Sequence, residues 1–210
     1  NDDTKEDCFA TLAMTIGVDF CYHNLMLILG VDPGTARLGI GLIENSGKEL
    51  KFIHAECLET SMEASMPERL FFLQEAISDI LIKYKPDVMA VESLFFGINA
   101  RTAIAVGQAR GVILATAARH KVPVFDYQGL SVKFAITGSG KSKKKEIQEG
   151  VRKILRMKDI IKPDDAADGL AIAIAHHIKT DPREIAKKEI RVKAAAKAKA
   201  DLKKAKKHKA

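Results

Sequence analysis

Four acidic residues of the chain stand where carboxylates can act together. Asp32 and Glu92 each end a short apolar run, and Asp165 and Asp168 lie three residues apart, shortly after Pro163. In open α/β sheets, active sites collect outside the carboxyl ends of the strands, so the first two acids are expected at one edge of a sheet. At a spacing of three, the other two share one face of a helix, where like charges repel. The pattern indicates a group of acids that needs a partner of opposite charge.

Cations are the natural partner, because four carboxylates cannot all stay ionised within a few ångströms of one another. Oxygen ligands without His or Cys select Mg²⁺ or Mn²⁺ over Zn²⁺. Two such ions, about 3.5–4 Å apart, orient and deprotonate a water, polarise a phosphodiester and stabilise the leaving oxygen. Convergence of the four acids would therefore create a two-ion Mg²⁺ site for phosphodiester hydrolysis, in which Mn²⁺ substitutes.

The acids between residues 164 and 168 also have a purely structural interpretation. Asp164 or Asp165 can cap the following helix and offset the positive end of its dipole, which contributes about 1 kcal/mol. Capping needs one acid, whereas this segment holds three within five residues, ahead of the apolar run Leu170–Ala175. Asp164 is the better candidate for the cap. Spacing alone leaves both interpretations open, since acids at strand ends are common.

The elements that must position the acids alternate along the chain. Apolar runs typical of strands cover residues 25–32, 38–43, 50–57, 88–92 and 122–125. Helical spacing covers residues 65–85, 99–120, 142–157 and 166–178. The first three strands form a predicted meander, and the later alternation of strand and helix predicts parallel neighbours. The fold class is α/β.

Length and charge predict one folded domain with two extensions. The 210 residues, 47% hydrophobic, are enough for one sizeable core and too few for two ordinary domains. Of the formal net charge of +7, residues 181–210 carry 12 Lys/Arg against 4 Asp/Glu. We expect a domain at 25–180, an N-terminal extension of unknown role at 1–24 and a Lys/Ala-rich basic tail at 181–210. The tail either binds a polyanion or is simply solvated.

Composition also excludes several classes of protein. No apolar run approaches the ~20 residues that a membrane-spanning helix needs. Three cysteines, Cys8, Cys21 and Cys57, form an odd set without CxxC spacing, which favours a reducing compartment and predicts a cytoplasmic protein. The apolar stretch Phe9–Phe20 follows acidic residues where a signal peptide needs positive charge, so we do not expect a signal peptide.

A series of short motifs runs in order from about Leu25 to Ile178. The segments are Ile28–Gly34, Val91–Gly97, Asn99–Ala103, Gly107–Gly111, Pro123–Phe125, Val132-Lys133, Thr137-Gly138 and Lys162–Asp168. In this order and at these separations they resemble the motifs of the RuvC family, the bacterial crossover-junction endodeoxyribonucleases. Several motifs together are far more specific than any one of them.

The resemblance implies a fold, a site and a set of partners. The fold is RNase H-like, a five-stranded mixed sheet flanked by helices, assembled as a homodimer. Asp32, Glu92, Asp165 and Asp168 match the catalytic, metal-binding positions. The family resolves four-way Holliday junction DNA in recombination and repair by nicking two strands symmetrically. Its usual partners are the branch-migration proteins RuvA and RuvB, and its place is the nucleoid of the bacterial cytoplasm.

Basic and aromatic residues near the acids are the expected DNA contacts. Lys133 and Lys144 match family positions that meet the DNA backbone, and Lys141, Lys143 and Lys145 add charge to the same loop. Phe95 lies where a family aromatic stacks on an unpaired base, which contributes about 1–3 kcal/mol. Without the resemblance, such lysines are more often solvated, and an apolar run around Phe95 is more often core.

The helix predicted at 99–120 has two interpretations. Two symmetric cuts need two sites related by a two-fold axis, and Gly107 and Gly111 permit the close backbone approach of a dimer interface. An Ala-rich helix that is apolar nearly all round also suits the centre of a core; the resemblance favours the interface. Two departures from the family concern glycine: Gly129 and Gly169 stand where relatives often carry Pro and Ala, and a glycine inside a helix costs about 1 kcal/mol.

Three other functions remain open. Asp32-Pro-Gly-Thr35 resembles the first phosphate loop of actin-like ATPases and sugar kinases, but the chain is short for two lobes and shows no second phosphate loop. A RuvC-like nuclease that processes ribosomal RNA shares the fold but lacks the motif that begins at Glu92. A DNA-binding structural protein with idle acids is the third, and the four intact acids argue against it.

Overall fold

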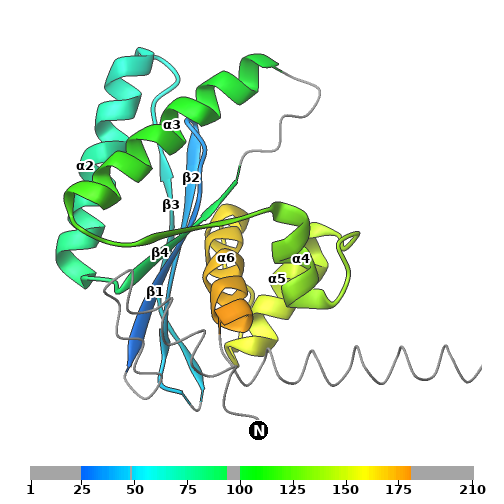
Figure 1. Cartoon of the computed structure of the whole chain (residues 1–210). Helices are drawn as coiled ribbons and strands as arrows, with labels where there is room; N and C mark the ends of the chain where they lie inside the picture. The colour runs from blue at the N-terminus through cyan, green and yellow to red at the C-terminus, as the bar shows by residue number, and fades with distance from the viewer. Residues whose placement is uncertain (1–24, 48, 94–99, 181–210) are drawn as a thin grey trace, which may run out of the picture.

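The computed structural model describes residues 25–47, 49–93 and 100–180, and its strands form one mixed sheet (Figure 1). The strands are β1 (Met26–Asp32), β2 (Arg37–Asn45), β3 (Leu50–Glu59), β4 (Val88–Glu92) and β5 (Val124–Tyr127). Their order across the sheet is β3-β2-β1-β4-β5. β1, β2 and β3 are antiparallel neighbours, whereas β4 is parallel to both β1 and β5. The predicted five-stranded mixed sheet is confirmed.

Helices cover both faces of this sheet, which gives three layers. They are α2 (Met66–Tyr84), α3 (Ala100–Arg119), α4 (Gly129–Thr137), α5 (Lys144–Ile154) and α6 (Asp164–Thr180). In Figure 1 the sheet is seen nearly edge-on, with α2 and α3 on its left and α4, α5 and α6 on its right. Each face has its own hydrophobic core. Residues 1–24, the tail 181–210 and Phe95 lie outside the described residues.

Two elements differ from the sequence pattern. β5 begins at Val124 rather than Val122, because the Val122 N–H donates to Ala117 O and closes the end of α3. The pattern does not predict α4, a nine-residue helix that starts at a glycine. Packing explains it: Val132 and Ile136 are buried in the core that α4 shares with α5 and α6. A short helix of this kind depends on tertiary contacts more than on propensity.

The alternation of β2 assigns its residues to the two faces of the sheet. Leu38, Ile40 and Leu42 are fully buried in the core beneath α2 and α3. The residues between them, Gly39 and Gly41, face α6. Successive side chains of a strand point to opposite faces. One face of β2 is therefore aliphatic, and the other lacks side chains where α6 crosses it.

Glycine lets the backbone of α6 lie directly on β1 and β2. A Cβ atom added at Gly30 would lie 2.5 Å from Ala173 N, and one added at Gly39 would lie 2.9 Å from the Asp165 carbonyl carbon. From the helix side, a Cβ at Gly169 would lie 2.6 Å from Gly41 N. Real Cβ atoms do not approach other atoms this closely. Glycine at position 169 lowers helix propensity, but it is required here because the position has no room for a side chain.

Burial decides between the two interpretations of the helix predicted at 99–120. α6 is buried from Ala166 through His176 with the exception of Asp168, between the sheet on one side and α4 and α5 on the other. In α3, by contrast, Ala109, Ile113 and Ala117 are buried on one face, while Ile104 and Gly111 are exposed on another. The central-core interpretation of residues 99–120 is wrong; α6 is the central helix.

A methyl group added at Gly41 tests the importance of the backbone packing between α6 and β2. We expect Gly41→Ala to lower the free energy of unfolding by about 3 kcal/mol, the upper end of the usual range for overpacking, because the new Cβ would overlap the backbone of Leu170 and the strand and helix would have to separate. Urea unfolding followed by circular dichroism measures the change. Gly140→Ala is the control, since its Cβ would make only ordinary contacts of 3.5 Å or more. Equal stability of the two variants would contradict the packing argument.

Candidate metal centre

Strand direction brings the first two acids to the same edge of the sheet. Asp32 is the last residue of β1 and Glu92 the last residue of β4. These strands are parallel neighbours, with Val31 opposite Val91, so both end on the same side. The two carboxyl groups share a hydrogen bond. They line one pocket of about 260 Å³, whose wall also includes Lys133, Lys144 and Asp168.

The first turns of α6 supply the other two acids. Asp165 and Asp168 lie near the start of the helix, where its close approach to Gly39 holds it over the ends of β1 and β2. One carboxylate oxygen each from Asp32, Asp165 and Asp168 lies within 4.8 Å of the others. Within the part of the chain that the structure describes, this is the one group of three residues with metal-ligand geometry.

Burial and mutual repulsion change how these acids ionise. Burial, reinforced by the charges of Glu92 and Asp168, raises the pKa of Asp32 to about 8. Burial also raises the pKa of Glu92 and of Asp168, although Lys133 opposes the shift at Glu92 and Lys144 opposes it at Asp168. The two carboxyl groups are coupled, so the raised pKa of Asp32 favours one proton held by this pair at neutral pH when no metal is bound.

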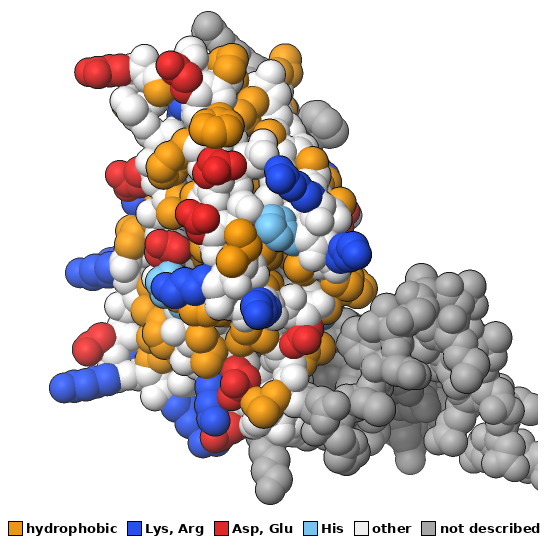
Figure 2. All heavy atoms as spheres, turned by 90° about the vertical axis from the view of Figure 1, so that its left-hand side faces the viewer, with side chains coloured by type: hydrophobic (Ala, Val, Ile, Leu, Met, Phe, Trp, Pro, Cys, Tyr) orange, Lys and Arg blue, Asp and Glu red, His pale blue; other side chains and the backbone are white. Residues whose placement is uncertain are grey.

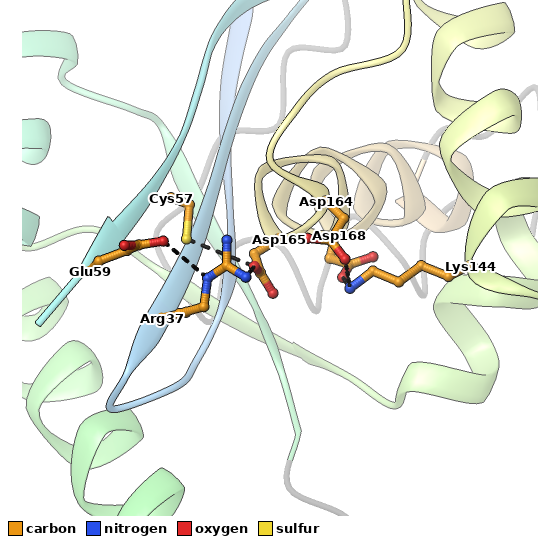
Figure 3. Close-up of polar contacts among 7 residues, drawn as sticks. All are labelled: Arg37, Cys57, Glu59, Lys144, Asp164, Asp165 and Asp168. Carbon is orange, nitrogen blue, oxygen red and sulfur yellow. Dashed lines mark hydrogen bonds and ion pairs between the residues drawn. The ribbon is translucent and has the colours of Figure 1, made fainter. Parts of the chain in front are cut away.

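Two cationic side chains flank the acids from opposite sides (Figure 3). Lys144 Nζ lies 2.7 Å from Asp164 Oδ2 and 3.2 Å from Asp168 Oδ2. Although burial acts against its charged form, these hydrogen bonds raise the pKa of Lys144. Arg37 Nη1 lies 3.1 Å from Asp165 Oδ2. The cluster already binds positive charge, and its donors are all carboxylate oxygens, so the residues present fit Mg²⁺ or Mn²⁺.

Asp164 has a different place from the one predicted. It is the first residue of α6, not the residue before the helix, and its carboxylate forms the ion pair with Lys144. That contact lowers the pKa of Asp164. The residue therefore stabilises the helix N-terminus as an acid in the first turn and ties α6 to α5. It is not one of the three acids with metal-ligand geometry.

The carboxylate of Glu92 lies beside Gly129, a glycine named above as a departure from the family. A Cβ atom at Gly129 would overlap Glu92 Oε1. Gly129 is the first residue of α4, so the carboxylate of Glu92 lies against the start of that helix. Negative charge is favoured at such a position, because the first backbone N–H groups of a helix are unpaired.

The predicted DNA-contacting residues lie in two places. Lys133 and Lys144 line the pocket that holds Asp32 and Glu92. Lys141, Lys143 and Lys145 are exposed around the start of α5. Lys141 lines a separate depression between α4 and α5, away from the acids. Phe95 lies outside the described residues, so its predicted role stays a prediction.

Sequence reasoning missed the partners of Asp165, which are Arg37 and Cys57, and also Glu59, which pairs with Arg37. They come from the ends of β2 and β3, and no local motif marks them. The alternation of β2 is the signal that was available, since Arg37 shares a strand face with Gly39 and Gly41, which contact α6.

His176 lies in the core of the protein and not among the acids. Its ring is fully buried, with Nδ1 2.9 Å from the Tyr127 hydroxyl and the ring of Phe125 packed beside it. Burial lowers the pKa of His176 to about 4, so it is neutral at physiological pH. It is a core residue of α6.

The fold and the site together define a class of protein. A mixed sheet in the order β3-β2-β1-β4-β5, with carboxylates at the ends of β1 and β4 and on the helix that crosses them, is that of an RNase H-like, metal-dependent nuclease. The family model "Crossover junction endodeoxyribonuclease RuvC" matches residues 28–176. The chain belongs to the RuvC family of crossover junction endodeoxyribonucleases.

Relatives and solved structures agree with this assignment. The chain is 50% identical over 151 residues to RuvC of Desulforamulus reducens, which covers 72% of this chain and 93% of the relative. It is 47% identical over 150 residues to RuvC of Rubrobacter xylanophilus, covering 71% and 84%. The Thermus thermophilus RuvC structure matches at 35% identity with a TM-score of 0.66, over 72% of this chain and 93% of that one. T. thermophilus RuvC in complex with a Holliday junction substrate matches at 32% identity with a TM-score of 0.71, over 76% and 97%.

More distant structures share the fold alone. The yeast mitochondrial Holliday junction resolvase Ydc2 is 13% identical with a TM-score of 0.54, over 70% of this chain and 76% of that one.

None of the helices in the described ranges is long and apolar enough to cross a membrane.

The raised pKa of Asp32 predicts how stability depends on pH. Between the ordinary value of 3.8 and about 8, the folded protein holds a proton that the unfolded chain has released. The stability contributed by this group is therefore lost as pH rises through that window. In EDTA, we expect the midpoint of thermal unfolding to fall more steeply toward about pH 8 for wild type than for Asp32→Asn.

Added Mg²⁺ should reverse this loss, since an ion replaces the proton, and its stabilising effect should increase with pH. Asp79→Asn, which removes an exposed acid of α2, is the control and should follow wild type. Identical pH profiles for wild type and Asp32→Asn would show that Asp32 is not the titrating group.

Proposed function

We propose that this chain resolves four-way junction DNA by hydrolysing one phosphodiester in each of two strands. Family membership supports the reaction class, and the RuvC complex with a Holliday junction supports the substrate. The observation that carries the proposal is the meeting of Asp32, Asp165 and Asp168, from two distant segments, with ligand atoms within 4.8 Å of one another. Capping the N-terminus of α6 would need only one acid, so helix capping does not explain a group of three.

We assign catalytic and metal-binding roles to four acids: Asp32, Glu92, Asp165 and Asp168. Asp32 is central, because it belongs to the three-acid group and also shares a hydrogen bond with Glu92. Asp32, Glu92, Asp165 and Asp168 would together hold the two ions. Bound Mg²⁺, or Mn²⁺ in its place, polarises the phosphodiester and activates the attacking water. The acids hold their geometry for this because the strand ends and α6 fix their backbones.

DNA binding is assigned to the basic residues around the acid pocket and to one aromatic residue. They are Lys133, Lys141, Lys143, Lys144, Lys145 and Phe95. Lys133 and Lys144 lie at the pocket, where a phosphate next to the cleaved bond would pass. Binding of metal and DNA would give Lys144 a phosphate in place of its contacts with Asp164 and Asp168. The exposed lysines at the start of α5 extend the positive charge along the backbone path.

The proposed homodimer interface is the layer of α2 and α3, which covers the sheet face opposite to α4, α5 and α6. α2 exposes Phe71, at 63% of its surface, and Ile82, at 59%, while α3 exposes Ile104 at 66%. A Cβ at Gly111 of α3 would meet no other atom within 4 Å, so internal packing does not require this glycine. Figure 2 looks onto this layer and shows hydrophobic side chains spread among charged ones. A two-fold axis here would pair apolar faces and leave both acid pockets open.

The remaining assignments follow from the substrate. Residues 25–180 form the nuclease domain; the basic tail 181–210 would add sequence-independent DNA affinity, and residues 1–24 have no assigned role. RuvA and RuvB are the proposed partners, since a resolvase acts on junctions that other proteins recognise and move. The proposed place of action is the nucleoid of a bacterial cytoplasm.

Cleavage of a labelled mobile four-way junction, beside a linear duplex of the same sequence, tests this function. We expect paired nicks in the junction with Mg²⁺ and none with EDTA. Asp32→Asn should lower the rate by more than about 100-fold while junction binding survives, because it removes a group that acts in the transition state. The control Glu49→Gln changes an exposed acid near the β2–β3 turn, at the end of the sheet away from Asp32, and should cleave like wild type.

Other outcomes point to other functions. Junction binding without cleavage in Mg²⁺ or Mn²⁺ would support a DNA-binding protein with idle acids. No preference for the junction would overturn the resolvase proposal, and structured RNA would then be the next substrate to test.

The lysine assignments predict how binding depends on salt. Replacing Lys141, Lys143 and Lys145 together by Ala should reduce the slope of log affinity against log salt by about 2–3, since each lost phosphate contact releases roughly one counterion fewer. Junction binding is measured in Ca²⁺ or EDTA, to prevent cleavage, over a series of salt concentrations. Lys51→Ala is the control, because this lysine pairs with Glu44 near the β2–β3 turn, away from the acids. An unchanged slope would remove these lysines from the interface.

A further inference from the structure

Asp165 has polar partners on the side away from the other acids. Its Oδ2 atom lies 3.1 Å from Arg37 Nη1 and 3.9 Å from Cys57 Sγ. Arg37 Nε in turn lies 3.2 Å from Glu59 Oε1. Figure 3 shows the guanidinium between the two carboxylates, with Cys57 beside it. One oxygen of Asp165 is thus engaged by the sheet.

The sheet register produces this arrangement. Arg37 is directly opposite Glu59 in the antiparallel β2–β3 pair, and Gly39 is opposite Cys57. All four residues share the face of the sheet that α6 crosses, because side chains alternate along each strand. Gly39 leaves room for the backbone of Asp165, which places its side chain beside Arg37.

This contact answers a physical problem of the site. Asp165 lies within reach of two other acids, so repulsion favours turning its carboxylate outward into solvent. Lys144 gives Asp168 a fixed partner from α5, and Arg37 gives Asp165 one from β2. The Arg37 and Asp165 side chains are 45% and 21% exposed, so the pair contributes little to stability, and its geometric effect is the greater one. A guanidinium suits this purpose, since its rigid fork can bond two carboxylates at once.

We propose that Arg37 is a positioning residue, which holds the Asp165 carboxylate in the metal centre and is itself held by Glu59. This inference rests on the proposed function in one respect, the role of Asp165 as a metal ligand. Arg37 acts through Asp165 and needs no contact with the reacting atoms. Groups that orient ligands in this way typically change metal affinity by about 10–100-fold when removed.

Arg37 has an opposite interpretation that makes the test sharp. A positive charge beside the site also repels a metal ion, so a guanidinium that only neutralised Asp165 would weaken metal binding. Removing it would then strengthen binding. For a variant that lacks the Arg37 guanidinium, positioning thus predicts weaker metal binding, and competition predicts stronger metal binding.

The first experiment measures Mn²⁺ binding to the full-length, DNA-free protein by isothermal titration calorimetry. We expect Arg37→Met to bind Mn²⁺ about tenfold more weakly than wild type. Arg37→Lys should lose at least as much, because it keeps the charge that repels the ion and loses the fork that bonds Glu59 and Asp165 together. Glu59→Gln should show a smaller loss. Arg156→Met is the matched control, since among the residues that the structure describes Arg156 pairs with Glu49 near the β2–β3 turn, and it is 80% exposed.

A double-variant comparison shows whether Arg37 acts through Asp165. In an Asp165→Asn background, Arg37→Met should change Mn²⁺ affinity by less than about twofold, because the carboxylate that it positions is absent. Thermal unfolding in EDTA confirms that each variant folds. In junction cleavage, Arg37→Met should raise the Mg²⁺ concentration needed for half-maximal rate, with junction affinity in EDTA unchanged.

Three results would overturn the proposal: tighter Mn²⁺ binding by Arg37→Met, wild-type binding by Arg37→Lys, or an equal loss in the presence and absence of Asp165. The calorimetry needs no DNA and no cleavage. A wild-type protein that bound Mn²⁺ but did not nick junctions would refute the proposed function, while leaving the role of Arg37 to be decided by the titrations.

Discussion

The contact on which the rest of this structure depends is the direct backbone packing of α6 on β1 and β2. Glycines at positions 30, 39 and 41 of the sheet and 169 of the helix leave no side chain between the two elements. Where a helix covers a sheet, side chains of the two elements normally fill the space between their backbones. Here that layer is missing over the strand ends, so short Asp side chains from α6 and β1 can reach a common point. Larger residues at these positions would lift α6 and separate the acids.

The close approach has an electrostatic cost, which the protein meets in three ways. Burial raises the pKa of Asp32 to about 8, which favours a proton on the Asp32–Glu92 pair. Lys144 contacts Asp164 and Asp168 from α5, and Arg37 contacts Asp165 from β2. A divalent ion could replace or assist each of these partners, so the acids proposed as its ligands are already gathered without it. The raised pKa values are the sign of a site shaped for a ligand and not for stability alone.

The two faces of the sheet carry different properties. The face covered by α4, α5 and α6 holds the acids, the pocket and the lysines assigned to DNA. The face covered by α2 and α3 has an aliphatic core beneath and exposed Phe71, Phe72 and Ile104 above. Such a division allows a molecule to pair through one side while the other stays open to a substrate. It also explains why α3 is apolar nearly all round without being buried: one face packs inward, and another remains exposed for the proposed partner.

The sequence by itself determined the elements and the identity of the acids. Apolar runs that end at Asp32 and Glu92, the helix that begins around Asp165, and the order of the motifs predicted an α/β sheet with a metal site at its edge, because these signals are local in the chain. It did not reveal α4, the role of Gly169 or the partners of Asp165. Arg37 and Glu59 become neighbours only through the β2–β3 register, and Asp165 reaches them only because α6 lies against Gly39. Those contacts join residues far apart in sequence, so tertiary packing alone decided them.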